Sequence, residues 1–417
     1  MKTEIIAVGA ELLSPDFQDT NSLFLTAGLN GIGLDVSFKT VVGDDEADLE
    51  RVIRTALGRS RLILCMGGLG PTEDDRTRET LAKVLGRRLV YRPDIRAAIR
   101  ERFRRRGRPM SRSNLKQCYV IEGAEVLDNP NGTAPGQWLC LGRRRVALLP
   151  GPPREIRPMF EAQVLPRLAP LHRGVMVRRV VRLTGLGESA MESRLKPFYA
   201  AVPGGVAVTT LASPGDLAIH LTYRGREAGP GIKAVDGLVK RVEGRLGPFV
   251  YSRNGESLEE VVGALLVEKR LTLACAESCT GGLIGHRLTG VPGSSAYFLE
   301  SAVVYSNAAK TARLGVSREL LVKHGAVSAA AAKAMALGVR RTSRADLGLS
   351  VTGVAGPGGG TVRKPVGLVY IALAHGRGVT VFKELFFGDR AQVKFQSSQK
   401  ALDVLRKFLT KGRRMAL

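Results

Sequence analysis

Two long stretches of the chain alternate short apolar runs with segments whose apolar residues recur every three or four positions. The first stretch covers residues 3–170, and the second begins at residue 255. Apolar runs of this length are typical of buried strands, whereas the periodic segments are typical of amphipathic helices. Strands that alternate with helices form parallel sheets covered by helices, because each parallel crossover needs a long connection. We therefore predict an α/β fold in both stretches.

The segment between these stretches has a different pattern. Residues 175–185 and 206–225 are rich in strand formers, whereas residues 189–201 and 232–247 have helical spacing. This pattern predicts a small α+β unit. A length of 417 residues, at about 150 residues per domain, favours two or three domains. We predict domains at 1–170, 171–252 and 253–417.

The third domain opens with a recognisable helix start. Ser257 is followed three residues later by Glu260, which is the pattern of a capping box before the apolar run that follows.

The positive charge of the chain bears on its partners. The net charge is +25, and the densest basic stretch is residues 87–116. Within it Ile95, Ile99 and Phe103 predict one apolar face of a helix over 93–107, with arginines on the other faces. A basic surface suits nucleic acid, but aromatic residues make up only 5% of the chain, so base-stacking side chains are few. A nucleic-acid partner is therefore not favoured.

No apolar run approaches the roughly 20 residues that span a bilayer, and the N-terminus resembles a strand more than a signal peptide. We expect a soluble, cytoplasmic protein with no membrane partner. The five cysteines form no CxxC pair and the five histidines are scattered, which favours reduced structural thiols over a zinc centre.

A glycine-rich turn with acidic residues follows an apolar run in the first domain. Gly67, Gly68 and Gly70 come directly after the run, at the end of a strand where open α/β sheets bind ligands. Asp74 and Asp75 then supply hard oxygen ligands that suit Mg²⁺ and, through it, phosphates.

A second candidate site lies in the third domain. Ser278 follows the apolar run 272–276 and precedes Gly281 and Gly282, whose backbone N–H groups could hold an oxyanion or a phosphate. No histidine is suitably spaced as a base, so Lys310 is the candidate. Its pKa would have to fall by about 3 units, or about 4 kcal/mol, through burial or a neighbouring cation. Arg390 could supply that cation and hold a substrate phosphate, and Tyr305 could relay a proton or fix the lysine.

Other interpretations of these residues stay open. Ser278 could be a helix cap, Lys310 a solvated helix residue, and Ser294 and Ser295 ordinary N-caps. Cys279 is intrinsically the stronger nucleophile, but it has no evident base and ranks below Ser278. Ser295 precedes a helix as Ser278 does, so it remains an alternative nucleophile.

The motifs of both outer domains resemble one family. The front motifs are similar to the molybdopterin-binding-like domain of the competence-induced CinA family, and seven later motifs resemble its C-terminal domain. Two departures are Ser14-Pro15 and Gly358, where the family usually has glycine and aspartate. The front motifs are Gly9–Leu13, Asp19–Asn21, Gly67–Asp75, Asn131–Gly136 and Leu149–Glu155; the later motifs run AESCTGG, PGSSAYF, YSNxxK, GAVS, TGVAGP, KPVG and GDR.

This resemblance implies three domains, the middle one a small KH-like module, and two activities that fit pyridine-nucleotide salvage. The C-terminal domain would hydrolyse nicotinamide mononucleotide to nicotinic acid mononucleotide and ammonia, without a cofactor. The N-terminal domain would be an ADP-ribose pyrophosphatase that requires a divalent metal such as Mg²⁺. A homodimer that acts on small nucleotides is expected.

The site residues follow from the same resemblance. The catalytic residues would be Ser278, Lys310, Tyr305 and Ser295. The substrate-binding residues would be Thr280, Gly281, Gly282, Thr352 and Arg390 in the C-terminal domain and Gly67, Gly68, Gly70 and Asn131 in the N-terminal domain. The metal ligands would be Asp74, Asp75 and Glu155.

Two other functions fit parts of the sequence. The arginine-rich stretch favours a nucleic-acid-binding accessory protein in competence or DNA damage, and the front fold alone favours a molybdopterin-binding protein.

Overall fold

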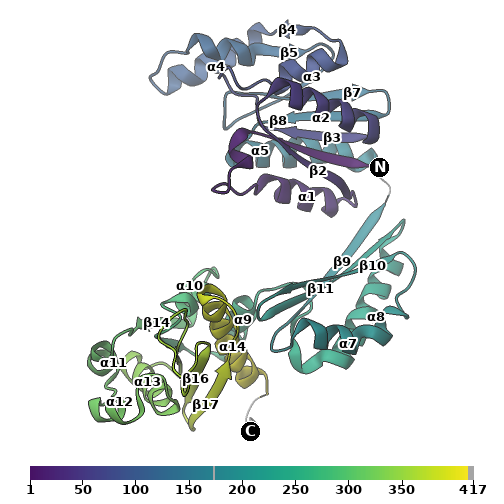
Figure 1. Cartoon of the computed structure of the whole chain (residues 1–417). Helices are drawn as coiled ribbons and strands as arrows, with labels where there is room; N and C mark the ends of the chain where they lie inside the picture. Colours follow the sequence, from purple (N-terminus) through teal and green to yellow (C-terminus); the bar gives the residue numbers. More distant parts are fainter. Residues whose placement is uncertain (172–173, 412–417) are drawn as a thin grey trace. The chain divides into compact units, whose positions relative to one another are not determined.

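The computed structural model describes residues 1–171 and 174–411 (Figure 1). By its internal contacts the chain divides into two compact units. One unit contains the residues before Val177 together with Arg224–Gly231, and the other contains the remaining described residues. The predicted boundary after residue 170 lies next to the undescribed residues 172–173, and the predicted end of the third domain lies in the undescribed residues 412–417. No helix in the described ranges is long and apolar enough to cross a membrane.

The N-terminal unit is built on a six-stranded sheet in the order β2-β1-β3-β8-β7-β6. The first four strands are parallel, as predicted, but β7 pairs antiparallel with both of its neighbours, β8 and β6. The expectation of a purely parallel sheet was therefore wrong at this edge. The reason is local, since β7 and β8 are joined by a two-residue turn that leaves no room for a crossover helix. The strands are β1 Thr3–Val8, β2 Val36–Val42, β3 Leu62–Met66, β6 Glu125–Leu127, β7 Gly136–Leu141 and β8 Arg144–Leu149.

Helices cover both faces of this sheet (Figure 1). One apolar cluster joins the sheet to α1 and α5, and a second joins its other face to α2 and α3. All five residues of β3 are buried, because this central strand is covered on both sides. The helices are α1 Asn21–Gly31, α2 Glu46–Arg59, α3 Thr77–Leu85, α4 Pro93–Arg105, α5 Pro153–Met159 and α6 Leu165–Leu168, and a short pair of strands, β4 Leu89–Tyr91 and β5 Tyr119–Ile121, lies beside α4.

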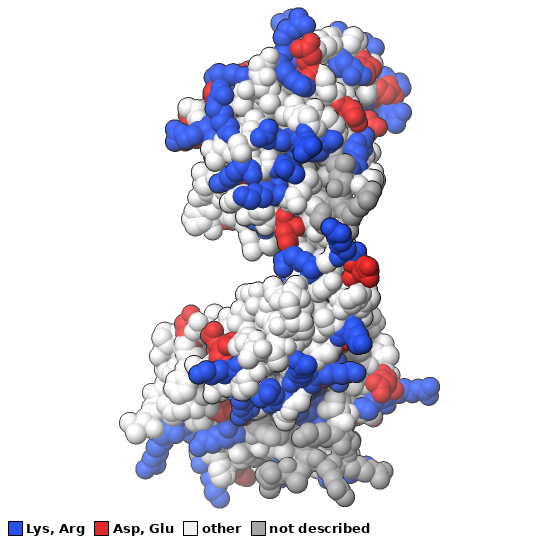
Figure 2. Space-filling model, turned by 90° about the vertical axis from the view of Figure 1, so that its right-hand side faces the viewer, with Lys and Arg blue, Asp and Glu red and all other residues white. Residues whose placement is uncertain are grey.

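The predicted arginine-rich helix is α4. Ile95 and Ile99 are buried and Phe103 packs against them, so the apolar face is confirmed. The helix begins at Pro93, and the chain turns back at Gly107, whose φ of +66° is in the left-handed region. Positive charge is not confined to α4, because Lys and Arg also outnumber Asp and Glu on the face shown in Figure 2.

The middle segment is the predicted α+β unit. A four-stranded sheet in the order β10-β11-β9-β12 packs against two helices through one apolar cluster. Its elements are β9 Val175–Leu183, α7 Glu188–Tyr199, β10 Val206–Ser213, β11 Asp216–Gly225, α8 Ala228–Leu246 and β12 Val250–Ser252.

The C-terminal segment has a five-stranded sheet in the order β14-β13-β15-β16-β17. Strand β13 is parallel to both of its neighbours, β14 and β15, and β16 and β17 form the predicted antiparallel hairpin. The capping box of Ser257 and Glu260 is confirmed at the start of α9. The strands are β13 Leu273–Glu277, β14 Phe298–Val303, β15 Leu347–Gly353, β16 Leu368–His375 and β17 Gly378–Leu385.

Helices α9, α10 and α14 share one apolar cluster with the sheet, and α11, α12 and α13 cover its other face. Helix α12 was not predicted, because its seven residues are too few to show a period clearly. The helices are α9 Leu258–Lys269, α10 Leu283–Thr289, α11 Asn307–Leu314, α12 Arg318–His324, α13 Ala329–Ser343 and α14 Arg390–Lys411.

Candidate active site

Three parallel strands, β14, β13 and β15, place the C-terminal candidates at one edge of the sheet, where the strands have their carboxyl ends. Glu277, the last residue of β13, pairs with Val303 on β14 and with Val351 on β15. Ser278 comes next, and its N–H donates to the Val351 carbonyl over 3.0 Å. Tyr305 follows the end of β14, and Thr352 is the last residue but one of β15. The structure therefore brings Ser278, Tyr305 and Thr352 to the same edge.

Lys310 reaches this edge from the first turn of α11. Ser306 caps the helix by accepting from the Ala309 N–H, and Lys310, on the same helix, is buried. Its exposed fraction is 1%, and its Nζ lies 3.1 Å from Ser278 Oγ, 2.9 Å from the Val304 carbonyl and 3.1 Å from the Tyr305 carbonyl.

These three contacts determine how the amine can act. Burial lowers the pKa of Lys310, which Cys279 opposes only weakly, and so favours the neutral amine. A neutral amine has two N–H groups, and two carbonyl oxygens stand ready to accept them. Its lone pair is then left for the Ser278 hydroxyl, which is the geometry of a general base beside a nucleophile.

A buried carboxylate occupies the N-terminus of α10. Glu277 is fully buried, and its oxygens accept from the N–H groups of Gly282, Ile284 and Gly285 at 2.9–3.1 Å. The Gly281 N–H is also engaged, with the Ser278 carbonyl at 3.1 Å. The two amides that we expected to hold an oxyanion are therefore already bound, that of Gly282 by the Glu277 carboxylate and that of Gly281 by a backbone carbonyl.

Two other side chains of the same loop, Thr280 and Cys279, differ in whether they can take part in the chemistry. The Thr280 hydroxyl is buried and has no hydrogen-bond partner among the described residues. Burial raises the pKa of the Cys279 thiol to about 12, so this cysteine is a neutral thiol near pH 7. That result agrees with its rank below Ser278.

Arg390 and Tyr305 lie together at the more exposed side of the site. The Arg390 guanidinium donates to the Tyr305 hydroxyl over 3.0 Å and to the Gly356 carbonyl over 2.7 Å. Tyr305 contacts Lys310 through its backbone carbonyl, whereas the residue as a whole is 60% exposed. The tyrosine hydroxyl therefore positions Arg390, and burial rather than that cation lowers the pKa of the lysine.

Ser295 lies at the opposite ends of the strands, where β13 and β14 begin. It precedes β14, whose first residue Phe298 pairs with Leu273 at the start of β13. The five residues of β13 separate that position from Ser278 by about 16 Å at a rise of 3.3 Å per residue. Within one chain, Ser295 therefore does not lie near Lys310. This serine lies within a short 3-10 helix rather than at an N-cap.

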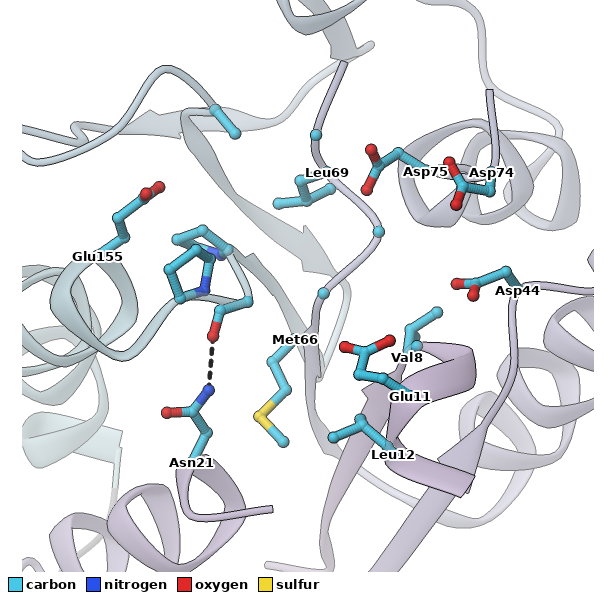
Figure 3. Close-up of a pocket in the computed structure, with 18 of the residues that line it drawn as sticks. Val8, Glu11, Leu12, Asn21, Asp44, Met66, Leu69, Asp74, Asp75 and Glu155 are labelled. Carbon is cyan, nitrogen blue, oxygen red and sulfur yellow. Dashed lines mark hydrogen bonds between the residues drawn. The ribbon is translucent and has the colours of Figure 1, made fainter. Parts of the chain in front are cut away.

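The N-terminal candidates surround a pocket of about 510 Å³ (Figure 3). Gly67, Gly68 and Gly70 line it together with Asp74 and Asp75. A Cβ on Gly67 would collide with the Val8 carbonyl, and one on Gly68 with the Thr77 hydroxyl. These glycines are thus required by close contacts within the fold, and their backbone remains open toward the pocket.

Not every predicted N-terminal residue faces this pocket. Asn131 is exposed and donates to the Arg154 carbonyl over 2.8 Å, and it is not among the lining residues. Thr133 and Ala134 line the pocket in its place. The loop turns between these positions, so adjacent residues of one motif face different sides.

Four carboxylates lie on one side of the pocket and Glu155 lies on the other (Figure 3). Hydrogen bonds from Thr72 hold Asp75 and also lower the pKa of Asp74, whereas Asn129 donates to Glu155 over 2.8 Å. In the part of the chain that the structure describes, no three Asp, Glu, His or Cys side chains are close enough to hold one metal ion. Asp74, Asp75 and Glu155 therefore do not form a preassembled metal centre. The four carboxylates on one side are Glu11, Asp44, Asp74 and Asp75.

Three family models match successive parts of the chain. They are described as "Probable molybdopterin binding domain" for residues 4–170, "Damage-inducible protein CinA KH domain" for residues 178–252 and "CinA C-terminal domain" for residues 255–409. A CinA-like protein of Koribacter versatilis is 46% identical over 98% of this chain and 100% of its own length. The chain belongs to the CinA family.

Other CinA proteins and solved structures are also similar in sequence to this chain. A CinA-like protein of Solibacter usitatus is 45% identical over 98% of this chain and 99% of its own length. Among solved structures, the competence/damage inducible protein CihA of Agrobacterium tumefaciens is 38% identical, with a TM-score of 0.35, and covers 36% of this chain and 94% of its own. The protein CinA of Thermoplasma acidophilum is 34% identical, with a TM-score of 0.37, and covers 39% of this chain and 95% of its own.

Some residues of this CinA chain carry a role that sequence reasoning missed. Glu277 was quoted only as part of a motif, although an acidic residue just before a helix start is a signal for an N-terminal anchor. Lys394 was not considered, yet its Nζ lies 3.7 Å from where a Cβ of Gly281 would stand. It follows Arg390 by four residues on α14, and that spacing could have revealed a second cation beside the Ser278 loop. Glu11 and Asp44 were likewise absent from the predicted metal ligands.

Proposed function

We propose that the C-terminal site hydrolyses the carboxamide of nicotinamide mononucleotide to nicotinic acid mononucleotide and ammonia. The observation that carries this proposal is the 3.1 Å contact between Lys310 Nζ and Ser278 Oγ at a buried position. The substrate comes from the family resemblance, and a site rich in cations suits a mononucleotide phosphate.

In the first half-reaction, neutral Lys310 accepts the proton of the Ser278 hydroxyl as Oγ attacks the carboxamide carbon. The resulting oxyanion needs a donor that is not already bound. The buried Thr280 hydroxyl, which has no partner in the described chain, is the group we assign to it. Lys310 then gives its proton to the leaving nitrogen, and ammonia departs to leave an ester on Ser278.

In the second half-reaction, Lys310 takes a proton from water, which attacks the ester carbon. The Ser278 oxygen recovers that proton as the acid is released. Arg390, held by Tyr305, and Lys394 bind the substrate phosphate at the exposed side of the site. Thr352 donates to the Ala326 carbonyl over 2.8 Å and supports the wall beside Ser278.

The test is ammonia release from nicotinamide mononucleotide by the wild type, S278A, K310A and S295A. We expect S278A and K310A to lose at least about 10³-fold in kcat, because removing a nucleophile or its base disables the whole unit. Ser295→Ala should stay within about threefold of wild type. The proposal fails if S278A or K310A retains near-wild-type kcat while its fold, measured by circular dichroism, is unchanged.

We propose further that the N-terminal pocket hydrolyses the pyrophosphate of ADP-ribose. The glycine turn and the four carboxylates along one side favour this reaction over binding of molybdopterin alone. Mg²⁺ is usually held by one or two carboxylates plus substrate phosphates. The spread of these side chains therefore suits a metal that enters with the nucleotide better than a resident one. Release of AMP from ADP-ribose in the presence of Mg²⁺ tests the reaction, and tight molybdopterin binding without any turnover would contradict it.

A further inference from the structure

A groove of about 690 Å³ lies along α4 in the N-terminal unit, on a surface that the two proposed reactions do not use. One wall is the exposed face of the helix, and the other is the segment that returns after Gly107. Met110 anchors this segment, because it packs on the same apolar cluster as Ile95 and Ile99. The groove is therefore built by packed backbone on both sides. Its arginines are Arg96, Arg100 and Arg104 from the helix and Arg108 and Arg112 from the returning segment.

Most of this charge has no internal partner. Glu101 is the one acidic residue among the lining residues, and it pairs with Arg104 and Arg105 at 2.6 and 3.0 Å. The other four groove arginines, at 96, 100, 108 and 112, are exposed and have no carboxylate within 4 Å in the described ranges. Four like charges around one hollow repel one another and attract an anion with several charges.

A second hollow adjoins the groove at Arg112 and has one aromatic lining residue, Tyr119. Arg112 lines both, and the second hollow, of about 400 Å³, is also lined by Lys116 and Tyr119. Tyr119 meets Tyr91 edge to face, with ring centroids 5.4 Å apart, and the two residues are 38% and 36% exposed. Glu73 and Glu79 also line this hollow; Arg78 pairs with Glu79 at 2.5 Å, whereas Glu73 is exposed and has no ion pair in the described ranges. A partly exposed tyrosine, Tyr119, thus shares a hollow with Arg112, one of the four unpaired arginines.

We propose that this groove binds single-stranded nucleic acid. Arginines four residues apart on α4 are spaced by about 6 Å along the axis, so successive guanidinium groups can engage successive phosphates of one strand. Tyr119, supported edge to face by Tyr91, then stacks on an unpaired base, which a duplex would keep inside its own stack. The combination of a cationic groove and an adjacent aromatic side chain distinguishes this ligand from a small polyphosphate, which has no use for the ring.

The test is fluorescence anisotropy of the full-length protein with a labelled 20-nucleotide DNA strand of mixed sequence, across a salt series. The groove variant replaces Arg96, Arg100, Arg108 and Arg112 with serine. A matched control replaces four exposed basic residues of the same unit, Lys2, Arg61, Arg143 and Arg144, with serine. We expect the groove variant to lose at least about 50-fold in affinity, and its slope of log K against log salt to fall by about 3, at about 0.7 per lost phosphate contact.

A second variant tests Tyr119. Tyr119→Thr keeps a strand former in β5 and should weaken binding by about fivefold or more while the salt slope stays unchanged. The proposal is overturned if the groove and control variants lose affinity equally, or if Tyr119→Thr has no effect and inorganic polyphosphate displaces the strand completely. Preference for a duplex of the same sequence would also overturn it. Ammonia release should be the same in all these variants, so failure here is separate from failure of the proposed reactions.

Discussion

The Ser278 site and the N-terminal pocket differ in how much of their chemistry is already assembled. At Ser278 the nucleophile and its base are in contact, the base is buried, and two carbonyls hold its hydrogen atoms. In the N-terminal pocket the carboxylates lie around an open space, and several of them hold their own loops instead. The difference teaches that a buried amine can be prepared by desolvation alone, whereas grouped carboxylates repel one another until a cation joins them.

The largest expected effect separates the two sites. Asp75→Asn should lower ADP-ribose hydrolysis by at least about 100-fold and leave ammonia release from nicotinamide mononucleotide within about twofold. Ser278→Ala should do the reverse. A chelator should likewise stop only the first reaction. Assays of both products on the same preparations check this, and loss of both activities in either variant would show that the sites are not independent.

A second test compares how each site supports the fold. Glu277→Gln removes the charge that binds three amides of α10 and the Ser301 hydroxyl, 2.8 Å away. We expect it to lower the free energy of unfolding by about 2–4 kcal/mol, because buried donors lose a charged acceptor. Asp75 is half-buried, so Asp75→Asn should lower the free energy of unfolding by less than about 1 kcal/mol. Urea unfolding of both variants measures the contrast, and equal losses would contradict it.

The pH dependence of ammonia release sharpens the role of burial. The pKa of Lys310 is lowered by desolvation, and only the deprotonated amine can accept the Ser278 proton. The value of kcat/KM should therefore rise about tenfold per pH unit below that pKa and level off above it. The inflection should lie below the ordinary lysine value of about 10.4. A profile that falls with rising pH over this range would rule out Lys310 as the base.

The smallest expected effect concerns the exposed side of the C-terminal site. Tyr305→Phe removes the hydroxyl that accepts from Arg390 but keeps the backbone carbonyl that holds Lys310. We expect KM for nicotinamide mononucleotide to rise about threefold with kcat nearly unchanged, because only substrate binding loses a support. A loss of kcat above about tenfold would instead indicate that the hydroxyl takes part in proton transfer.

Much of the fold followed from patterns with a local cause. The helix starts at Ser257 and Pro93, the hairpin of β16 and β17 and the apolar face of α4 all rest on neighbours within a few residues. The antiparallel edge formed by β6 and β7 did not follow, because pairing direction depends on how the chain returns in space.

The site was predictable only in part, for the same reason. The residue types at Ser278 and Lys310, a hydroxyl and an amine, pointed to a nucleophile and a base. However, 31 residues lie between them in the sequence, and only the parallel register of the strands brings them into contact. The binding of the Gly282 amide by Glu277 and the outward direction of Asn131 likewise depend on side-chain direction, and the binding of the Gly281 amide depends on how the backbone turns after Ser278.

The sequence by itself determined which elements form and which residue types can do chemistry, because periodicity and capping are local and nucleophiles and bases are properties of side chains. Only the tertiary structure decided that Lys310 is buried against Ser278, that Ser295 lies at the other edge, and that no three carboxylates meet in the described part of the N-terminal pocket. Burial and distance arise when distant segments pack together, and they determine the pKa of an amine and the ligands that an ion can reach.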